Sequence, residues 1–457
     1  MGCQCLLADI VQALASNPKG ILNNRLTERV SSITTDSRTV QPGDLFVALK
    51  GDRFDGHTFV ETALAQGAIA AVISNQTTTY ADAPILQVPD TLSAYQTLGR
   101  WWRDRFPYPV IAITGSVGKT TTKEMIAAVL STQGSVLKTQ ANFNNEIGVP
   151  KTLLELDPKH HRFAVVEMGM RAAGEIALLS QLARPDVAVI TNVGTAHIGR
   201  LGSEAAIAQA KCELLAEMHD IGTAVLNADN DRLMTTAAKV WQGITLTYGL
   251  DGGDVRGTLV DANTLQVGSM TFELPLPGHH NAQNFLAALA VAKALDIDWA
   301  PLMRGLQVEL PAGRARRHAL PNDVVILDET YNAGLESMVA ALRLLADLPG
   351  TRRIAVLGTM KELGERSPEF HHQVGVAVRE LGIDHLLVLA DPAEEAALIE
   401  GAAPVPAVAF ANQASLNTHL LELIQPGDRL LFKGSRAVAL DRVVTEVMQQ
   451  LSLAATD

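Results

Sequence analysis

A glycine-rich loop at residues 114–122 carries the side chains best suited to chemistry in this sequence. The loop, Thr114-Gly115-Ser116-Val117-Gly118-Lys119-Thr120-Thr121-Thr122, follows an apolar run and precedes a segment of helical character. Glycines let successive backbone N–H groups face one anion, and a helix N-terminus adds partial positive charge. Lys119 would pair with the β- and γ-phosphates of a nucleotide, and the hydroxyl of Thr120 or Thr121 would bind Mg²⁺. The loop therefore predicts ATP binding.

The loop is shorter than the general phosphate-binding pattern G-x-x-x-x-G-K-[ST], whose first glycine would fall on Ile113. It has the form Gly115-x-x-Gly118-Lys119-Thr120 instead. A glycine turn followed by a solvated lysine is the alternative interpretation. The apolar run before the loop and the helix after it favour phosphate binding.

Three residues outside the loop are candidates for metal binding or catalysis. Glu167 ends the apolar run 163–166, where a carboxylate could hold Mg²⁺; a salt-bridged or helix-capping glutamate is the alternative. His197 follows a predicted strand, and it could be a ligand or an ordinary loop histidine. Lys211 lies in the middle of the apolar face of a predicted helix, so it must snorkel, pair with an acid or lose its charge. A neutral amine can react with CO₂ to give a carbamate, which is an anionic metal ligand.

Polar side chains further along the chain could contact a nucleotide or a substrate. Asn281 and Asn284 share one face near the start of an alanine-rich helix, where they could bind a base or ribose or simply cap the helix. Arg314 precedes a third block of elements, Asp328 ends a predicted strand there, and the basic stretch 433–436 occupies the last strand-to-helix turn. Such basic turns suit a carboxylate or phosphate; a solvated basic loop is the alternative.

The elements that position these residues predict an α/β protein of three domains. Residues 1–107 mix short strands and helices as an N-terminal domain, and 108–311 repeat strand, loop and helix, as in a parallel sheet. Residues 312–457 alternate again, as in a Rossmann-like domain. The stretch 106–109, Phe-Pro-Tyr-Pro, would end a helix and link the first two domains. A chain of 457 residues is too long for one ordinary core.

Hydrophobic periodicity gives the expected elements. Strands are expected at 45–49, 68–73, 85–88, 110–113, 163–166, 187–191, 223–226, 324–327, 353–357, 385–389 and 429–432. Helices are expected at 58–66, 92–105, 280–295, 335–345, 369–381, 414–424 and 437–451, with a strand-rich insert at 245–275.

Composition excludes several classes of protein. A net charge of -12 argues against nucleic-acid binding, which needs a basic face. The sequence has no run of 18 apolar residues and no secretion signal, so we expect neither membrane insertion nor export. Its three cysteines, Cys3, Cys5 and Cys212, show no metal-type spacing and suit a reducing compartment. We therefore expect a cytoplasmic protein.

Taken together, these motifs resemble the Mur ligase family over nearly the whole chain. The stretches that carry the resemblance are Thr114–Thr121, Asn144–Pro150, Glu167–Gly169, Asn192–His197 and Lys211–Leu214. The shortened glycine loop is that family's own form.

The outer motifs narrow the resemblance. The stretches 36–57, 357–365 and 433–436 favour an enzyme that adds D-alanyl-D-alanine to UDP-N-acetylmuramoyl-tripeptide. A family member that adds diaminopimelate or lysine is the alternative, and it would show Lys-Gly-His-Glu where this chain has Lys433-Gly434-Ser435-Arg436. A P-loop NTPase acting as a switch is a second alternative, against which the short loop and the three-domain layout count.

The resemblance implies a role for each candidate residue. ATP would bind at Gly115, Ser116, Val117, Gly118, Lys119, Thr120 and Thr121, with Asn281, Asn284, Arg314 and Asp328 as further contacts. Two Mg²⁺ ions would bind, one at Thr120 or Thr121 with Glu167, the other at His197 and a carbamylated Lys211. Lys119, His197 and Lys211 would be catalytic. Asp36, Ser37 and Arg38 would hold the uridine nucleotide in the first domain, and Asn144, Lys433, Ser435 and Arg436 would contact the peptide substrates.

The resemblance also implies an acyl-phosphate intermediate on the tripeptide carboxylate and a monomer whose domains close over ATP. The sequence departs from the family at two places. Residues 331–338 read Tyr-Asn-Ala-Gly-Leu-Glu-Ser-Met, whereas Tyr-Asn-Ala-Asn-Pro-x-Ser-Met is usual. Residues 439–441 read Ala-Leu-Asp where a Met-Glu pair is common.

Overall fold

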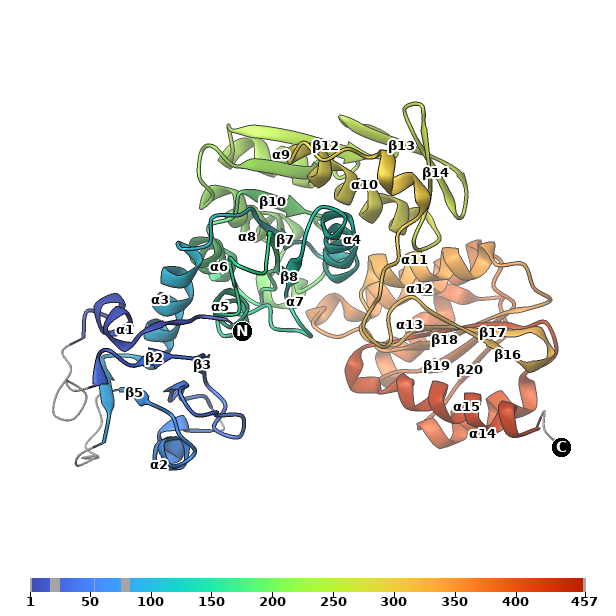
Figure 1. The fold of residues 1–457 in the computed structure, drawn as a ribbon. Coiled ribbons are helices and arrows are strands. Elements are labelled where there is room, and N and C mark those ends of the chain that lie inside the picture. The colour runs from blue at the N-terminus through green and yellow to red at the C-terminus, as the bar shows by residue number, and fades with distance from the viewer. Residues whose placement is uncertain (1, 17–24, 53, 75–82, 455–457) are drawn as a thin grey trace.

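The computed structural model describes residues 2–16, 25–52, 54–74 and 83–454, and these form an α/β protein (Figure 1). The described residues contain sheets of two, four, nine and six strands. The α/β class and the parallel-sheet character of its units, predicted from the sequence, are confirmed.

The first domain is built on a small parallel sheet in the order β3 (Ile33–Thr34), β4 (Leu45–Val47), β5 (Ala70–Ser74) and β6 (Ile85–Val88). A two-stranded antiparallel sheet, β1 (Cys5–Leu6) and β2 (Arg29–Val30), lies beside it. The helices are α1 (Leu7–Ala13), α2 (Val60–Ala65) and α3 (Thr91–Arg103).

Helix α3 joins the first domain to the second. The indole Nε1 of Trp102 donates to the carbonyl of Leu156 at 2.8 Å. The buried guanidinium of Arg103 donates to the carbonyl of Ala183 at 2.8 Å and to Asp186 at 3.0 Å. The helix end that precedes the predicted linker stretch 106–109 is therefore anchored to the second domain, and Phe106 is itself buried.

The central sheet has nine strands, in the order β15-β14-β13-β12-β11-β10-β7-β9-β8. Their bounds are β7 (Val110–Thr114), β8 (Val136–Lys138), β9 (Phe163–Glu167), β10 (Val187–Ile190), β11 (Thr223–Asn227), β12 (Ile244–Gly249), β13 (Val255–Asp261), β14 (Thr264–Val267) and β15 (Met270–Glu273). The helices are α4 (Lys119–Ser131), α5 (Gly148–Leu154), α6 (Glu175–Ala183), α7 (Ile198–Leu201), α8 (Glu204–Ala216), α9 (Asp231–Val240) and α10 (His279–Ala294).

The strand order of the central sheet fixes the place of the glycine loop. Strand β7 lies between β9 and β10 and is parallel to both, so the chain passes to opposite sides of it before and after β9. Ligands bind at the carboxyl ends of strands at such a switch point. The loop 114–118 leaves β7 at this edge, and α4 begins immediately after it.

The strand-rich stretch predicted at 245–275 is not a separate insert. Strands β12 and β13 continue the central sheet in parallel, and β14 and β15 add an antiparallel edge. Helix α10 packs against α4 and against this extension, with Phe272 and Phe285 edge to face at 5.7 Å. The stretch therefore covers a core that it shares with the nucleotide-loop helix.

The third domain has six strands in the order β16-β17-β21-β18-β19-β20, parallel except for the edge strand β16. The strands are β16 (Arg316–Leu320), β17 (Val324–Glu329), β18 (Arg353–Gly358), β19 (His385–Leu389), β20 (Ala407–Ala409) and β21 (Arg429–Lys433). The helices are α11 (Leu335–Asp347), α12 (Ser367–Glu380), α13 (Pro392–Ala402), α14 (Gln413–Leu423) and α15 (Leu440–Ala454). Asp328 lies within β17 rather than at its end.

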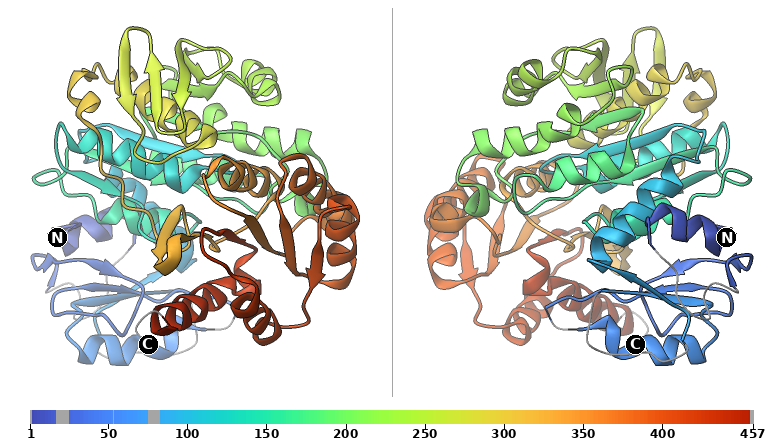
Figure 2. Two further views of the ribbon diagram at one scale, coloured as in Figure 1. Left: turned by 90° about the vertical axis from the view of Figure 1, so that its right-hand side faces the viewer. Right: turned by 90° about the vertical axis from the view of Figure 1, so that its left-hand side faces the viewer.

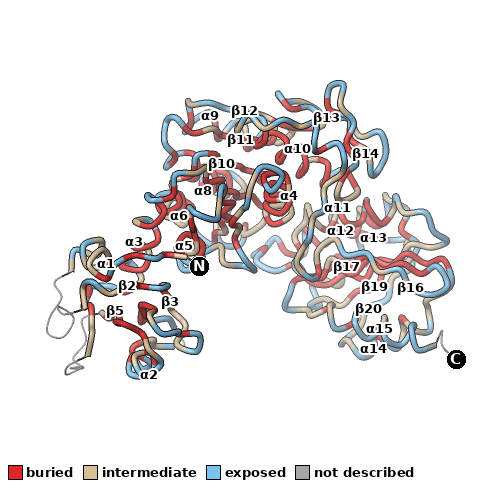
Figure 3. Tube along the Cα trace, in the orientation of Figure 1, coloured by how far each residue is buried: buried red, intermediate tan, exposed pale blue. Residues whose placement is uncertain are grey.

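The first and third domains both project from the same side of the central domain (Figures 1 and 2). Burial is concentrated in the three large sheets and in the helix faces against them (Figure 3). No helix among the described residues is long and apolar enough to cross a membrane.

Candidate active site

A cleft of about 1390 Å³ lies between the central and third domains. Residues at the N-terminal ends of three helices line it: Lys119 of α4, His279 of α10 and Leu335 of α11. Each helix is at least 13 residues long. Because a helix N-terminus carries partial positive charge and free N–H groups, this cleft suits a polyanion.

The glycine loop is held in shape by the strand end next to it. The hydroxyl of Thr191 donates to the carbonyl of Val117 at 2.6 Å, and Asn192 Oδ1 accepts from the N–H of Val117 at 3.0 Å. A Cβ at Gly115 would lie 1.9 Å from Thr191 Oγ1, so only glycine fits there. Gly118 caps α4 with a φ of 82°, in the left-handed region that glycine adopts most readily.

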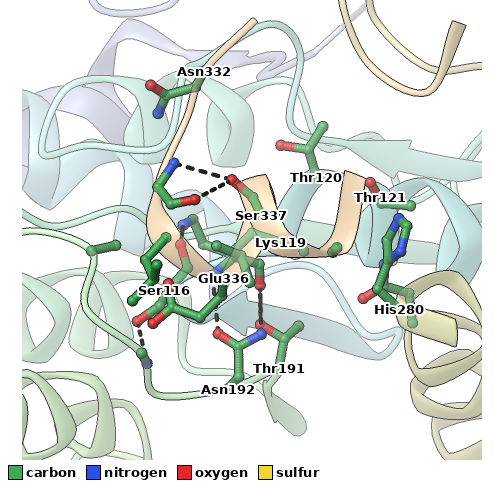
Figure 4. A pocket seen from close by; sticks show the side chains of 18 of the residues that line it. Ser116, Lys119, Thr120, Thr121, Thr191, Asn192, His280, Asn332, Glu336 and Ser337 are labelled. Atoms are coloured by element: carbon green, nitrogen blue, oxygen red, sulfur yellow. Dashed lines mark hydrogen bonds between the residues drawn. The ribbon is translucent and has the colours of Figure 1, made fainter. Parts of the chain in front are cut away.

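Lys119 lies inside this loop. Its Nζ donates to the carbonyl of Gly115 at 2.8 Å, and burial lowers its pKa. Figure 4 shows Lys119 together with Ser116 and with Glu336 of α11, which comes from the third domain.

Glu167, at the end of β9, is held by three partners. Thr120 Oγ1 donates to its Oε2 at 2.9 Å, and Asn144 Nδ2 donates to its Oε1 at 2.8 Å. The ammonium of Lys123 lies 3.9 Å from Oε2. Thr120, not Thr121, is therefore the residue whose hydroxyl hydrogen-bonds to this carboxylate.

A buried ion-pair network lies behind Glu167. Lys123 is 1% exposed; its Nζ donates to the carbonyl of Thr139 at 2.8 Å and lies 3.1 Å from Glu124 Oε1. Glu124 also pairs with Lys138. Charges this deeply buried are tolerated only when they are paired and hydrogen-bonded.

His197 contacts the third domain. It has a φ of 68°, and its Nδ1 hydrogen-bonds with Oε2 of Glu362, which lies between β18 and α12. Oε1 of the same carboxylate accepts from Arg200 at 3.1 Å. Burial lowers the pKa of His197, although Glu362 opposes that shift.

Lys211, in the middle of α8, does not snorkel to solvent, because its side chain is only 1% exposed. Within the described residues, no hydrogen bond or ion pair joins its Nζ. Burial, with a smaller contribution from nearby Lys119, lowers its pKa well below the usual lysine value. A neutral amine is therefore the favoured form of this side chain.

Of the two asparagines of α10, Asn284 lies against the glycine loop, and Asn281 holds the start of the helix. Asn284 Oδ1 accepts from the hydroxyl of Thr122 at 3.1 Å, and Asn281 Nδ2 donates to the carbonyl of Pro277 at 2.8 Å. Both line the cleft.

From the third domain, the guanidinium of Arg314 stacks on Tyr331, 4.0 Å from its ring centre. The buried Nε of Arg314 has no hydrogen-bond partner among the described residues. Lys433 Nζ donates to the carbonyl of Asn332 at 3.0 Å, and burial lowers its pKa.

The cleft brings together 13 of the predicted site residues. These are Ser116, Val117, Gly118, Lys119, Thr120, Thr121, Asn144, Glu167, His197, Asn281, Asn284, Arg314 and Lys433. Three other predicted residues, Lys211, Gly115 and Asp328, do not line the cleft themselves. Asp328 accepts a hydrogen bond from the Thr330 hydroxyl at 2.6 Å.

Five other predicted residues lie away from the cleft. In the first domain, Asp36 pairs with Arg38 at 2.7 Å, beside Ser37, and this pairing lowers the pKa of Asp36 to about 2. In the third domain, Ser435 is buried, and Arg436 pairs with Asp441 at 3.0 Å. These residues do not contribute to the nucleotide-loop cleft.

The sequence reasoning missed two carboxylates that cross between domains. Glu336 Oε1 accepts from the N–H of Thr195 at 2.7 Å, and Glu362 contacts His197 as described above. Glu336 lies in the stretch 331–338, where the sequence departs from the family, and Glu362 lies in the motif at 357–365, but neither stretch alone indicates its partner. Lys123 and His280 were also missed, and burial lowers the pKa of His280 to about 4.

Comparisons with known proteins match the chain to one family. The model of the Mur ligase middle domain matches residues 113–292, that of the Mur ligase glutamate ligase domain matches 313–436, and that of the Mur ligase family catalytic domain matches 29–102. Together they span most of the chain.

Relatives resemble it over nearly their whole lengths. The UDP-N-acetylmuramoyl-tripeptide–D-alanyl-D-alanine ligase of Synechocystis is 54% identical over 452 residues, covering 98% of this chain and 99% of the relative. A crystal structure of MurF from Acinetobacter baumannii matches with a TM-score of 0.89 and 34% identity, covering 98% and 99%. MurF ligase from Thermotoga maritima in complex with ADP matches with a TM-score of 0.83 and 32% identity, covering 92% and 98%.

Proposed function

The chain belongs to the Mur ligase family, and from that premise we propose that it joins D-alanyl-D-alanine to UDP-N-acetylmuramoyl-tripeptide, with ATP converted to ADP and phosphate. The observation that carries the proposal is the 54% identity to a ligase of that name over 98% of this chain. The reaction is a step in the synthesis of peptidoglycan precursors.

The cleft supports this chemistry. A carboxylate is a poor acyl donor because its leaving group would be oxide. Transfer of the γ-phosphoryl group of ATP to the tripeptide carboxylate releases ADP and gives an acyl phosphate. The amine of D-alanyl-D-alanine then attacks the acyl carbon, and phosphate and a proton leave.

The residues of this chain would hold and orient these groups. Lys119 and the N-terminus of α4 would contact the phosphates of ATP. Arg314 and Lys433 bring further positive charge from the third domain. The contact between the two domains at Thr195 and Glu336 would limit the access of water to the acyl phosphate.

We also propose two Mg²⁺ ions, which would offset the negative charge of the phosphates. Among the described residues, no group of three or more His, Cys, Asp or Glu side chains gathers to hold a metal. The available donors fit ions that share their ligands with phosphate: Thr120 with Glu167, and His197 with Lys211. Because Lys211 is buried, unpaired among the described residues and favoured as an amine, it can react with CO₂ and lose a proton to form a carbamate.

We propose that the protein acts as a monomer. We place the reaction in the cytoplasm, where ATP and UDP-linked precursors are found.

The test is phosphate release from ATP by the purified protein, with the product identified by its mass. We expect turnover with UDP-N-acetylmuramoyl-tripeptide and D-alanyl-D-alanine together. Turnover that needs diaminopimelate and the UDP-linked dipeptide, or that ignores every amine, would overturn the proposal. For the carbamate, we expect Lys211→Ala to be inactive and to recover with short-chain carboxylic acids; full activity without them would refute it.

A further inference from the structure

The geometry points to Glu362, in the third domain, as a positioning residue that orients His197 of the central domain for metal binding. This inference rests on the proposed metal role of His197. Under this inference, the His197 side chain is held in the orientation for metal binding only when the third domain is docked against the central domain.

The first observation is the hydrogen bond between Glu362 Oε2 and His197 Nδ1. A histidine that binds a metal through one ring nitrogen commonly donates the other N–H to a carboxylate, which fixes the tautomer and the ring plane. With Nδ1 engaged by Glu362, Nε2 remains for a metal. His197 lines the cleft, so the ring stands where phosphates are expected.

The second observation is the backbone on both sides of this contact. His197 and Glu362 both have left-handed backbone, with φ of 68° and 65°. Non-glycine residues adopt this region rarely, and such strain gathers at functional sites. Two strained residues that face each other across a domain boundary indicate that the contact is maintained by the surrounding structure.

The third observation is how closely the two loops approach. The N–H of Gly199 donates to the carbonyl of Glu362 at 3.0 Å. A Cβ on Gly199 would lie 2.5 Å from the nitrogen of Gly364. Because Gly199 and Gly364 have no side chains, the two backbones can approach closely, and this contact fixes the position of Glu362 relative to His197.

Glu362 also contacts Arg200, at 3.0 Å from Nη2 to Oε1. This second contact supplies a matched control. Arg200→Gln weakens docking between the loops but leaves the Glu362–His197 hydrogen bond available. A role of Glu362 in docking alone would make the two substitutions equivalent.

The experiment is a titration of the full-length protein with Mn²⁺, monitored by electron paramagnetic resonance, in the presence of a non-hydrolysable ATP analogue. We expect two Mn²⁺ sites in the wild type. Glu362→Gln should weaken one site about 10-fold or more, as loss of such outer partners does, while Arg200→Gln should leave both sites near wild type. Glu362→Asp should recover part of the loss. The Glu362 side chain is 35% exposed, so the variants are expected to fold, and circular dichroism checks this.

Wild-type Mn²⁺ binding by Glu362→Gln would overturn the inference, as would equal losses in Glu362→Gln and Arg200→Gln. The variant His197→Ala distinguishes the proposed metal role of His197 from the positioning role of Glu362. If it retains both sites, the proposed metal role of His197 fails, and the inference fails with it. If it loses one site while Glu362→Gln does not, only the inference fails. The same ranking is expected in turnover, where Glu362→Gln should raise the Mg²⁺ concentration for half-maximal rate more than it lowers kcat at saturating Mg²⁺.

Discussion

The buried ammonium of Lys123 is expected to stabilise the central domain strongly. Its Nζ lies 2.8 Å from the carbonyl of Thr139, 3.1 Å from Glu124 and 3.9 Å from Glu167. Both carboxylates belong to buried side chains. Lys123→Met would leave these two buried carboxylates with less compensating positive charge.

The size of the effect follows from this burial. Removing one partner of a buried ion pair typically costs about 3–5 kcal/mol of folding free energy. Glu124 would keep Lys138 as a partner, so we expect the lower end, about 3 kcal/mol. Lys138→Met is the matched control: the Lys138 side chain is 35% exposed, and loss of such a pair costs about 1 kcal/mol or less.

The assay is urea denaturation monitored by tryptophan fluorescence. Trp102, Trp241 and Trp299 all contact the central domain or its extension, so the signal reports on that domain. We expect Lys123→Met to shift the transition by several times the shift of Lys138→Met. In the double variant Lys123→Met/Glu124→Gln, part of the loss should be recovered because one unpaired charge has been removed.

A loss below about 1 kcal/mol in Lys123→Met would refute this reasoning, since it would mean that the carboxylates are solvated or protonated without the lysine. Equal losses in Lys123→Met and Lys138→Met would refute it as well, because the argument depends on the difference in burial.

Three further outcomes are expected. Gly118→Ala should lower ADP affinity in calorimetry by about 10-fold, because left-handed backbone costs about 1–2 kcal/mol without glycine and the new Cβ would lie 2.7 Å from Asn284 Oδ1; unchanged affinity would contradict this. Burial lowers the pKa of His280 to about 4 in the folded protein, so its contribution to stability is complete above pH 6.5 and is lost as the pH falls toward 4. The melting temperature should therefore depend less on pH in His280→Gln than in the wild type. The same dependence of melting temperature on pH in both proteins would disprove this. Gly199→Ala should enlarge the radius of gyration in X-ray scattering, because its Cβ would push Gly364 away; an unchanged radius would show that the loops adapt.

The sequence predicted the part of the site that depends on local pattern. Buried parallel strands appear as continuous apolar runs, so β7, β9 and β10 could be placed. Because the carboxyl ends of parallel strands share one edge, Glu167 was expected beside the glycine loop, and the Thr120–Glu167 hydrogen bond agrees with that expectation.

The elements that were missed lack such a signal. Edge strands β16 and β20 are largely exposed or half-buried, so their residues form no apolar run. Strand β8 is only three residues long. Because β8 could not be predicted, no signal in the sequence indicated that Lys123 of α4 is buried.

Contacts between domains also could not be predicted from the sequence. His197 and Glu362 lie 165 residues apart, and their pairing depends on how two folded units dock. The burial of Lys211 also depends on tertiary packing. The apolar face of α8 predicted that the methylene groups of the side chain are covered, but the exposure of the ammonium depends on how the neighbouring elements pack against α8. In the structure Lys211 as a whole is 1% exposed.

The anchoring of α3 by Trp102 and Arg103 has a consequence for substrate choice. Because the first domain is fixed to the central domain by buried hydrogen bonds, the span from its Asp36–Arg38 segment to the glycine loop is set by packing and not by a hinge. A substrate whose nucleotide binds at this segment, as the resemblance to the family implies, would have to bring its carboxylate to the loop across a constant distance. That distance would select substrates by the number of residues in the peptide, before any side chain is recognised.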